Sequence, residues 1–333
     1  MSTSRGGRDA GHRVDAGGRE HSRPAGGDAR GAAGPARVNA ARGRGAAPGR
    51  DATRGQGAAP GRDAARGRGA RGRGEPRGRG AEHGLGGEQV EGRRAVRELL
   101  ATQRRPVRDV WLSETVERGP VVAEIIELAE EAGVPLRLVP RGRLDAEART
   151  DAPQGVIAHA RALEEAELVE LCTRRAGAPV PFLVVLDGVT DPQNLGALLR
   201  TAEVAGATGI VLARHRAAHI TPTVAKAAAG AIEHLPITIV AGVPAALSTI
   251  AAHGVWTVGL DAQARTSVWD LELATEAVAL VLGSEGSGMS RLSRERCEML
   301  VAVPQQGRLE SLNVAAAGAI AAFEVARRRT SIS

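Results

Sequence analysis

The sequence predicts an α/β fold in which helices alternate with the strands of a parallel sheet. Two observations predict it: strand-like apolar runs alternate with helix-like segments through the C-terminal half, and a shorter pattern of the same kind precedes them. A third observation limits the fold, because the first 87 residues contain almost no large apolar side chains. We therefore expect a tail at 1–87, a small α/β domain at 88–162, a linker at 163–178 and a larger α/β domain at 179–330.

The first 87 residues predict a disordered tail. They hold 24 of the 43 glycines, and 18 arginines against eight acidic residues. They also repeat themselves, as in GAAPGRDATRGQ followed by GAAPGRDAARGR. Such a segment cannot bury enough apolar surface to offset the entropy of ordering. Two interpretations stand: an Arg-Gly arm that binds RNA through phosphate charge and guanidinium stacking, or a solubilising linker without a specific partner.

The rest of the composition indicates a reducing compartment and a soluble protein. The two cysteines, Cys172 and Cys297, form no C-x-x-C pair, which argues against a disulfide framework or a zinc site. His215 and His219 lack a third ligand nearby in the sequence, so we expect no metal. No apolar run reaches the roughly 18 residues of a membrane span, and the N-terminus lacks a hydrophobic signal region. We expect a cytoplasmic protein that does not enter a membrane.

The small domain is expected to begin with a helix over EQVEGRRAVRELLAT, because Val96, Leu99 and Leu100 share one helical face. The strand DVWLS follows, and then a helical stripe in VVAEIIELAEEAG that ends at Gly133. The strands PLRLVP and QGVIAHA complete the domain.

The larger domain is expected to be a parallel sheet, because helical segments fall between most of its strand candidates. Parallel sheets bind ligands in the loops at the carboxyl ends of their strands, and three such loops carry unusual polar residues. The strand candidates are 182–186, 209–213, 235–240, 256–260, 277–282 and 299–303.

Two of these loops lead into helices. In LDGVTDPQNLGALLR, Asn194 is a candidate helix cap, and Arg200 follows six residues later. In VPQQGRLESLNVAAAG, Ser311 is the candidate cap, and Asn313 is a poor helix former inside the first turn. Taken alone, the first loop needs no more than a cap and a surface cation, whereas Asn313 suggests a specific contact.

The third loop, LVLGSEGSGMSRL, is rich in glycine. The spacing of Gly283, Gly286 and Gly288 matches neither the dinucleotide pattern nor the phosphate loop, and no lysine follows. Glu285 at its centre would repel a pyrophosphate. The loop therefore suits a neutral or cationic ligand that needs close backbone contact, or else it is a plain glycine-rich turn.

Three strings closely resemble, in order and spacing, the three motifs of the SpoU (TrmH-like) RNA 2′-O-methyltransferases. They are FLVVLDGVTDPQNLGALLRTAEVAGATGIVL, LVLGSEGSGMSRLSRERC with the following VAVP, and ESLNVAAAGAIAAFEVARRR. The resemblance spans about residues 90 to 329. Among members, the chain looks most like the RlmB-type enzymes, which methylate a guanosine ribose in the peptidyl-transferase loop of 23S rRNA. The resemblance to this family implies a homodimer, a trefoil-knotted SPOUT domain, and an L30e-like RNA-binding domain at 88–162.

The resemblance also implies a cofactor and a site. S-adenosyl-L-methionine carries a positive sulfonium and no phosphate, which suits a glycine loop with a carboxylate. The positions that match the family's cofactor site are Leu282, Gly283, Glu285, Gly288, Val303, Pro304, Leu312 and Asn313. Those that match its catalytic set are Asn194, Arg200, Glu285, Ser311 and Asn313.

The chemistry suggests roles for that catalytic set. Methyl transfer to a ribose hydroxyl is an in-line displacement that requires alignment of donor and acceptor. Because arginine hardly deprotonates in proteins, we expect Arg200 to bind an RNA phosphate and to stabilise developing oxyanion charge. Asn194 would orient Arg200 or the ribose, while Glu285, Ser311 and Asn313 would hold the loops and the target nucleoside.

Three other functions account for some of the same features. The first is 2′-O-methylation of tRNA or of another rRNA site; the L30e-like domain favours rRNA over tRNA. The second is a non-catalytic RNA-binding factor for ribosome assembly, which would have little use for the five polar residues. An ordinary nucleotide-binding protein is disfavoured, because its glycine motif follows the first strand.

Overall fold

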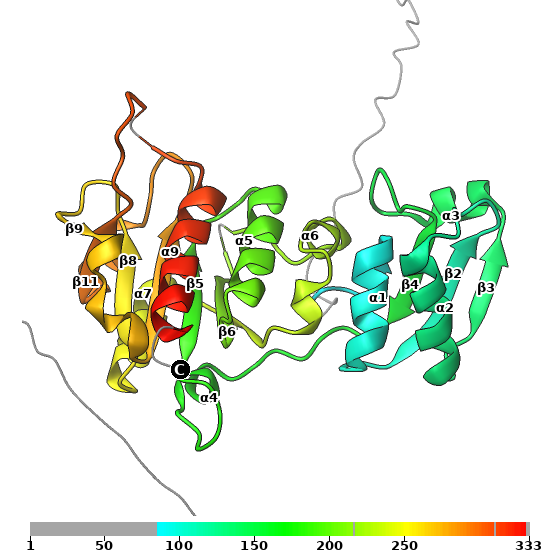
Figure 1. Ribbon diagram of the computed structural model, residues 1–333, viewed down its shortest axis with the longest axis horizontal. Helices are drawn as coiled ribbons and strands as arrows, with labels where there is room; N and C mark the ends of the chain where they lie inside the picture. The colour runs from blue at the N-terminus through cyan, green and yellow to red at the C-terminus, as the bar shows by residue number, and fades with distance from the viewer. Residues whose placement is uncertain (1–84, 216, 310, 331–333) are drawn as a thin grey trace, which may run out of the picture. The chain divides into compact units, whose positions relative to one another are not determined.

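The computed structural model describes residues 85–215, 217–309 and 311–330. These residues form two β-sheets, one of four strands and one of seven (Figure 1). The predicted disorder of the tail falls on residues outside the described part, except for its last three. There the boundary differs from the expected one, because Leu85 is buried and forms a β-bridge with Leu163.

The four-stranded sheet has the order β1-β4-β2-β3, in which β4 is antiparallel to β1 and β2, and β2 is parallel to β3. The predicted face of Val96, Leu99 and Leu100 is buried, which confirms that helix. It begins later than expected, because positive-φ Gly92 separates it from a strand that the sequence did not predict. The elements are β1 (Gln89–Glu91), α1 (Arg93–Thr102), β2 (Val107–Ser113), α2 (Pro120–Glu131), β3 (Leu136–Val139), α3 (Arg141–Glu147) and β4 (Val156–Ala160).

The seven-stranded sheet has the order β7-β6-β5-β10-β8-β11-β9 and is parallel throughout. All six predicted strands are confirmed. They are β5 (Phe182–Asp187), β6 (Gly209–Ala213), β7 (Ile237–Val240), β8 (Trp256–Leu260), β10 (Val278–Gly283) and β11 (Met299–Ala302); the two-residue β9 (Thr266–Ser267) was not predicted. The helices are α4 (Leu168–Cys172), α5 (Pro192–Val204), α6 (Pro222–Ala227), α7 (Val243–Ala252), α8 (Arg291–Arg296) and α9 (Val314–Thr330), with 3₁₀ turns η1 (Ala231–Glu233), η2 (Val268–Asp270) and η3 (Glu272–Thr275).

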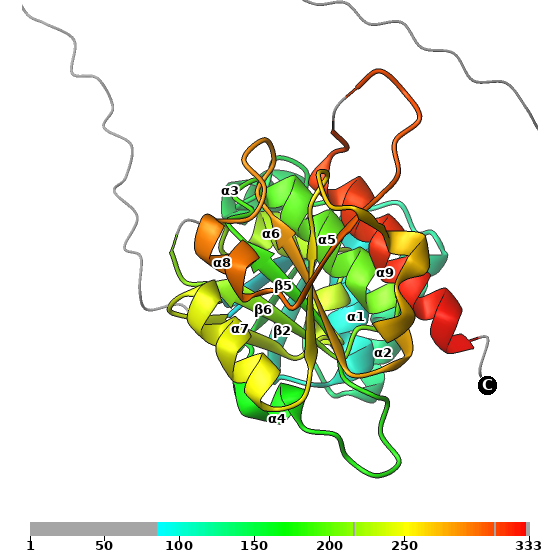
Figure 2. The same cartoon turned by 90° about the vertical axis from the view of Figure 1, so that its left-hand side faces the viewer.

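Helices cover both faces of this sheet. Helices α5 and α9 pack on one face, and α7 and α8 lie on the other (Figure 2). Strand β10 lies between β5 and β8, so that Gly283 at its end is level with Asp187 at the end of β5. The loops that follow β5, β10 and β11 therefore meet at one edge of the sheet.

Helix α9 packs closely against α5 and contains an ion-pair cluster of its own residues. A Cβ on Gly318 would lie 2.5 Å from Leu198 Cδ2, so the small residue allows α9 to approach α5. Glu324 is nearly fully buried and accepts hydrogen bonds from the guanidinium groups of Arg327 and Arg328. The bond from Arg327, together with Arg328, outweighs burial and lowers the pKa of Glu324 to about 2.

This lowered pKa predicts a pH-dependent contribution to stability. The carboxylate of Glu324 stabilises the fold fully above its unfolded pKa of 4.5, and this contribution is lost as the pH falls toward about 2. Glu324→Gln should lower the free energy of unfolding at pH 7 by up to about 3 kcal/mol, and the difference from wild type should shrink below pH 4.5. Urea unfolding of both proteins at several pH values measures this difference in the free energy of unfolding. Glu295→Gln, at an exposed ion pair, is the control, and a difference independent of pH would contradict the prediction.

The part of the chain that the structure describes offers neither a metal-ligand group nor a reactive thiol. Neither a helix able to cross a membrane nor a group of three potential metal ligands occurs in residues 85–215, 217–309 and 311–330. Cys172 and Cys297 are free thiols. Burial raises the pKa of Cys172 to about 11; burial, with the negative charges of Asp187 and Glu298, raises that of Cys297 to about 12. Both thiols therefore stay protonated and unreactive near neutral pH.

Candidate active site

The glycine loop folds back on the end of β10. A Cβ on Gly283 would overlap the backbone of Gly288 and Met289, so no side chain fits there. Ser284 and Gly288 exchange two backbone hydrogen bonds of 2.9 Å each. Gly286 and Gly288 have φ angles of +84° and +67°, in the left-handed region that glycine tolerates best. All three glycines are thus required by the backbone of this turn.

Three of the predicted polar side chains meet beside this loop. Asn194 Nδ2 donates to Glu285 Oε2 at 3.0 Å, and Asn313 Nδ2 donates to Asn194 Oδ1 at 3.0 Å. Asn313 Nδ2 also lies 3.4 Å from Glu285 Oε1. We call these three residues the amide–carboxylate cluster. No cation among the described residues pairs with Glu285, so its negative charge is available to a positively charged ligand.

The helix caps differ from those expected. Asp191, rather than Asn194, caps α5, because its Oδ1 accepts from the backbone N–H of Asn194 at 2.7 Å. Asn313, rather than Ser311, caps α9, since its Oδ1 accepts from the N–H of Ala315 at 2.9 Å. The amide of Asn194 is therefore free for the cluster. Asn313 uses its oxygen for the helix and its nitrogen for the cluster.

A cavity of about 180 Å³ lies next to the cluster, between the ends of β8 and β10 and the start of α9. Ser311 lines this cavity without a hydrogen bond to the cluster. Two residues predicted to bind the cofactor do not line this cavity: Pro304 lines a separate cavity, and Asn313 belongs to the neighbouring amide–carboxylate cluster. Of the residues predicted to bind a cofactor, six line it: Leu282, Gly283, Glu285, Gly288, Val303 and Leu312.

The sequence did not point to some of the lining residues, among them Leu260, Asp261, Gln305 and Ala317. Asp261 is fixed there, because its carboxylate pairs with Arg294 Nε at 2.7 Å and accepts from the backbone N–H of Gln263. The available signal was the position of Leu260 and Asp261 at the carboxyl end of β8, where parallel sheets bind ligands.

Arg200 lies apart from the cluster. Six residues along a helix correspond to about 9 Å of axial rise and about 240° of rotation, so Asn194 and Arg200 occupy different faces of α5. Arg200 lines a different cavity together with Arg94 and Lys226. Its guanidinium makes no hydrogen bond to another residue of the described part. The structure thus joins three of the five predicted catalytic residues, places Ser311 at the same cavity, and leaves Arg200 outside.

Two family models match separate parts of the chain. The SpoU rRNA Methylase family matches residues 181–323, which hold all seven strands of the seven-stranded sheet and most of α9. The model of RNA 2′-O ribose methyltransferase substrate binding matches residues 89–166, which contain the four-stranded sheet.

The chain is also similar to curated and solved proteins. It is 39% identical over 246 residues to Bacillus subtilis YacO, provisionally named a TrmH family tRNA/rRNA methyltransferase, covering 74% of this chain and 97% of YacO. It is 39% identical to the 23S rRNA (guanosine-2′-O-)-methyltransferase RlmB of Pseudomonas aeruginosa, covering 73% and 97%. The crystal structure of an AdoMet-bound rRNA methyltransferase from Sinorhizobium meliloti aligns with a TM-score of 0.58 at 25% identity, covering 72% and 87%. The chain belongs to the SpoU rRNA methylase family.

Proposed function

We propose that this protein transfers a methyl group from S-adenosyl-L-methionine to the ribose 2′-OH of a guanosine in the peptidyl-transferase loop of 23S rRNA. Membership of the family makes it an S-adenosylmethionine-dependent RNA 2′-O-methyltransferase. The observation that carries the proposal is the amide–carboxylate cluster beside the glycine-loop cavity. The choice of 23S rRNA guanosine rests on the similarity to RlmB proteins.

The cavity beside the glycine loop fits this cofactor chemically. Its walls include Leu260, Leu282, Leu312 and Val303, which suit an adenine ring, and the charge of Glu285 suits a sulfonium. When bound, the cofactor supplies the methyl group. The cavity volume lies below the roughly 300–1,000 Å³ of most ligand sites, so we propose that part of the cofactor extends beyond it or that the surrounding loops open on binding.

The chain's own residues would orient the acceptor. Glu285 accepts from the amides of Asn194 and Asn313 and thereby fixes the direction in which each amide points. We propose that these amides and Ser311 hold the ribose and its base near the cavity. Arg200, on another face of α5, would bind a phosphate of the same RNA strand rather than the reacting hydroxyl.

The proposal includes the architecture implied by the resemblance. We propose an L30e-like RNA-binding domain at 88–162, a linker at 163–178 and a trefoil-knotted methyltransferase domain at 179–330. The insertion of β10 between β5 and β8 supports an unusual chain path. The linker is not wholly irregular, because it contains α4, whose Leu171 and Cys172 pack in a core cluster.

We also propose that the protein works as a homodimer in the cytoplasm, where its ribosomal substrate is made. Phe323 on α9 is 48% exposed, and Val204 at the end of neighbouring α5 is 63% exposed. Exposed large apolar side chains on neighbouring helices suit a contact with a second copy.

The second candidate is 2′-O-methylation of tRNA or of another rRNA site, which the name of YacO favours. Methyl transfer from labelled S-adenosylmethionine to unmodified 23S rRNA and to bulk tRNA separates the two. We expect label in one guanosine of the peptidyl-transferase loop. Label confined to tRNA or to another rRNA site would keep the methyl transfer but reject the 23S rRNA guanosine as its target. If the cofactor binds and no RNA is labelled, an RNA-binding assembly factor is favoured.

Arg200→Ala should lower kcat/KM in this assay on the order of 100-fold, because a charged contact to the substrate is lost. The Kd for S-adenosylmethionine should not change, since Arg200 does not line the cofactor cavity. Arg175→Ala, at an exposed position, is the control. Near-normal turnover of Arg200→Ala would remove Arg200 from the proposed site.

A further inference from the structure

A second cavity, of about 610 Å³, is lined by residues of α1, α5 and α6 and carries excess positive charge. Its one lining carboxylate, Glu91, is fully buried and already accepts hydrogen bonds. The donors are the side chains of Gln89 and Thr150 and the backbone N–H groups of Arg149 and Thr150. The four cations that line the cavity are Arg93, Arg94, Arg200 and Lys226; we call them the cation cluster.

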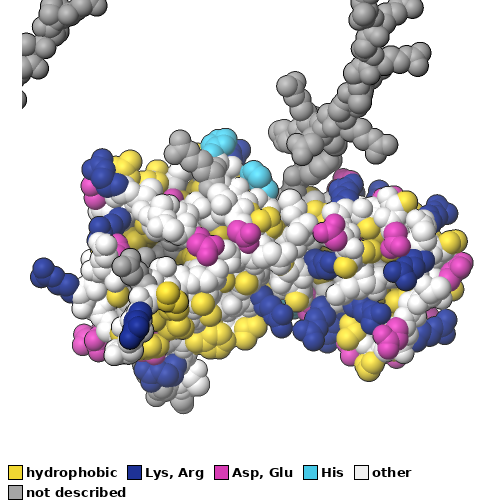
Figure 3. Space-filling model, turned by 90° about the horizontal axis from the view of Figure 1, so that it is seen from above, with side chains coloured by type: hydrophobic (Ala, Val, Ile, Leu, Met, Phe, Trp, Pro, Cys, Tyr) yellow, Lys and Arg dark blue, Asp and Glu magenta, His cyan; other side chains and the backbone are white. Residues whose placement is uncertain are grey.

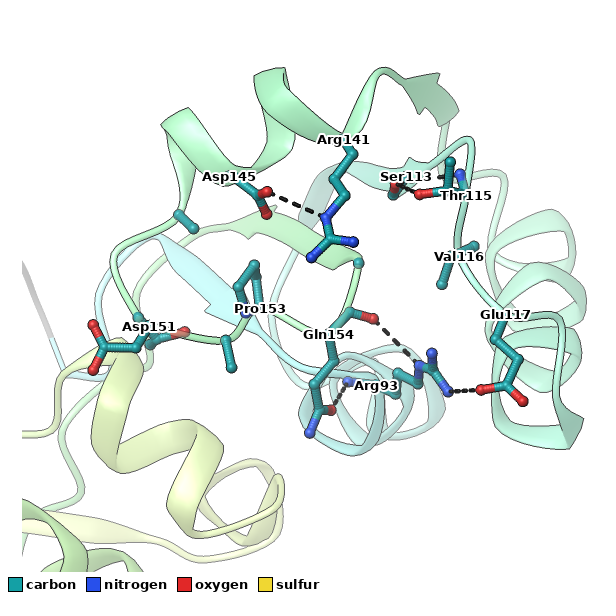
Figure 4. Close-up of a pocket in the computed structure, with 14 residues that line it drawn as sticks. Arg93, Ser113, Thr115, Val116, Glu117, Arg141, Asp145, Asp151, Pro153 and Gln154 are labelled. Carbon is teal, nitrogen blue, oxygen red and sulfur yellow. Dashed lines mark hydrogen bonds and ion pairs between the residues drawn. The ribbon is translucent and has the colours of Figure 1, made fainter.

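Most of the cation cluster has no protein partner. The side chains of Arg94, Arg200 and Lys226 make no hydrogen bond or ion pair within the described residues. Arg93 donates to the backbone oxygen of Gln154 and pairs weakly with Glu117, at 3.7 Å (Figure 4). Lys and Arg side chains gather in the middle of the face shown in Figure 3. The cations surround a cavity whose one lining carboxylate already accepts four hydrogen bonds, so they repel one another, and a bound anion would relieve that repulsion.

Two close backbone contacts build this cavity. Gly196 lies one turn before Arg200 on the same face of α5, and a Cβ there would overlap Ala227 of α6. Gly230, at φ +90°, would place a Cβ 2.5 Å from Glu98 Cβ of α1. Glycine at both positions lets α1, α5 and the end of α6 approach one another, which brings the cations to one cavity.

Strained backbone accompanies the cations. Gln154 and Ala229 line the cavity with φ angles of 58° and 52°, and they are two of the three non-glycine residues with positive φ in the described part. Such conformations cost free energy and gather at ligand sites more often than elsewhere. The N-terminus of α1 also opens here, with Arg93 and Arg94 in its first turn, and adds partial positive charge.

We propose that the cation cluster binds successive backbone phosphates of the substrate RNA. The inference rests on the proposed function and extends it from Arg200 to Lys226, Arg93 and Arg94. RNA is favoured over a small anion because the cations line a large cavity, and because the substrate-binding model, at 89–166, contributes two of them. The site provides affinity and register without reading sequence.

Lys226 makes this proposal directly testable, because it is the only lysine in the chain, against 43 arginines. An amine-selective acetylating reagent therefore reports on this one side chain in the full-length protein. An unmodified 23S rRNA fragment containing the peptidyl-transferase loop should slow acetylation of Lys226 by about fivefold or more. S-adenosylmethionine should not slow it, and inorganic phosphate at equal ionic strength should do so far less than RNA. Arg175→Lys adds an exposed reference lysine, whose acetylation RNA should leave unchanged.

Substitutions provide the second measurement. Lys226→Ala should weaken RNA binding about fivefold to tenfold and should reduce the slope of log affinity against log salt by roughly 0.7 to 0.9. Lys226→Arg should retain most of the RNA affinity and of the salt dependence, because it keeps the positive charge. Arg175→Ala should change neither.

Each outcome decides a separate question. Methylation of rRNA without protection of Lys226 would overturn the phosphate site and leave the proposed function standing. Protection of Lys226 without methyl transfer to any RNA would overturn the proposed function and leave the phosphate site standing. Equal protection by inorganic phosphate would replace RNA with a free anion, and the absence of both protection and methylation would reject both proposals.

Discussion

Gly283→Ala is expected to abolish S-adenosylmethionine binding, raising its Kd at least about 100-fold. The reason is steric, because the added Cβ would overlap the backbone of Gly288 and Met289 where the loop folds back on β10. A flexible side chain would yield to such an overlap, whereas two backbone segments cannot yield without opening the turn. Opening the turn moves Glu285 away from Asn194 and Asn313, so the amide–carboxylate cluster is lost as well.

Calorimetric titration of the cofactor measures this effect, and circular dichroism checks that the variant is folded. Gly142→Ala is the matched control, because a Cβ there meets nothing within 4 Å. That change should leave cofactor binding intact and stabilise α3 by up to about 1 kcal/mol. Normal cofactor affinity of a folded Gly283→Ala variant would show that the cofactor does not depend on this turn.

Arg105→Ala and Glu233→Ala should each lower the free energy of unfolding by about 3–5 kcal/mol. Both side chains are buried, with exposed fractions of 2% and 0%, and they form two hydrogen bonds of 2.6 and 3.1 Å. Arg105 also donates to the backbone oxygens of Gly87 and Arg161. Removing either partner would leave a buried charge without its counter-ion.

Chemical denaturation of the single variants Arg105→Met and Glu233→Leu and of the double variant that combines them tests this account. The double variant should be less destabilised than either single variant, because it removes both buried charges. Arg291→Ala, at an exposed ion pair with Glu295, should change stability by less than about 1 kcal/mol. Strictly additive losses in the double variant would show that the two charges do not depend on each other.

The strands of the larger sheet were predictable because most are apolar runs of strand length, and the central ones are buried on both faces. β10 illustrates this, since all six of its residues are buried. β1, with three residues, and β9, with two, are too short to show a period, and they exist through pairing with β4 and β11. Pairing with neighbouring strands in the folded protein therefore makes these two segments strands, and their local sequence does not predict it.

The site was predictable in its residues and less so in its geometry. The resemblance identified Asn194, Glu285 and Asn313, which the structure brings together. The caps were wrong, although Pro192 held the clue: proline favours the first helical position, which makes Asp191 the cap. The separation of Arg200 from the cluster also followed from helix geometry, because residues six apart lie on different faces.

The position of β10 between β5 and β8 has a consequence for synthesis of the protein. Phe182 at the start of β5 pairs with Val278 of β10, 96 residues later in the chain. During translation, β5, β6 and β7 can associate early, whereas β8 has no neighbour in the sheet until β10 and β11 leave the ribosome. Pairing over such separations is slow, because loop closure must precede the contacts that stabilise it. The ribosome would thus release a chain whose central strand is among the last to be made.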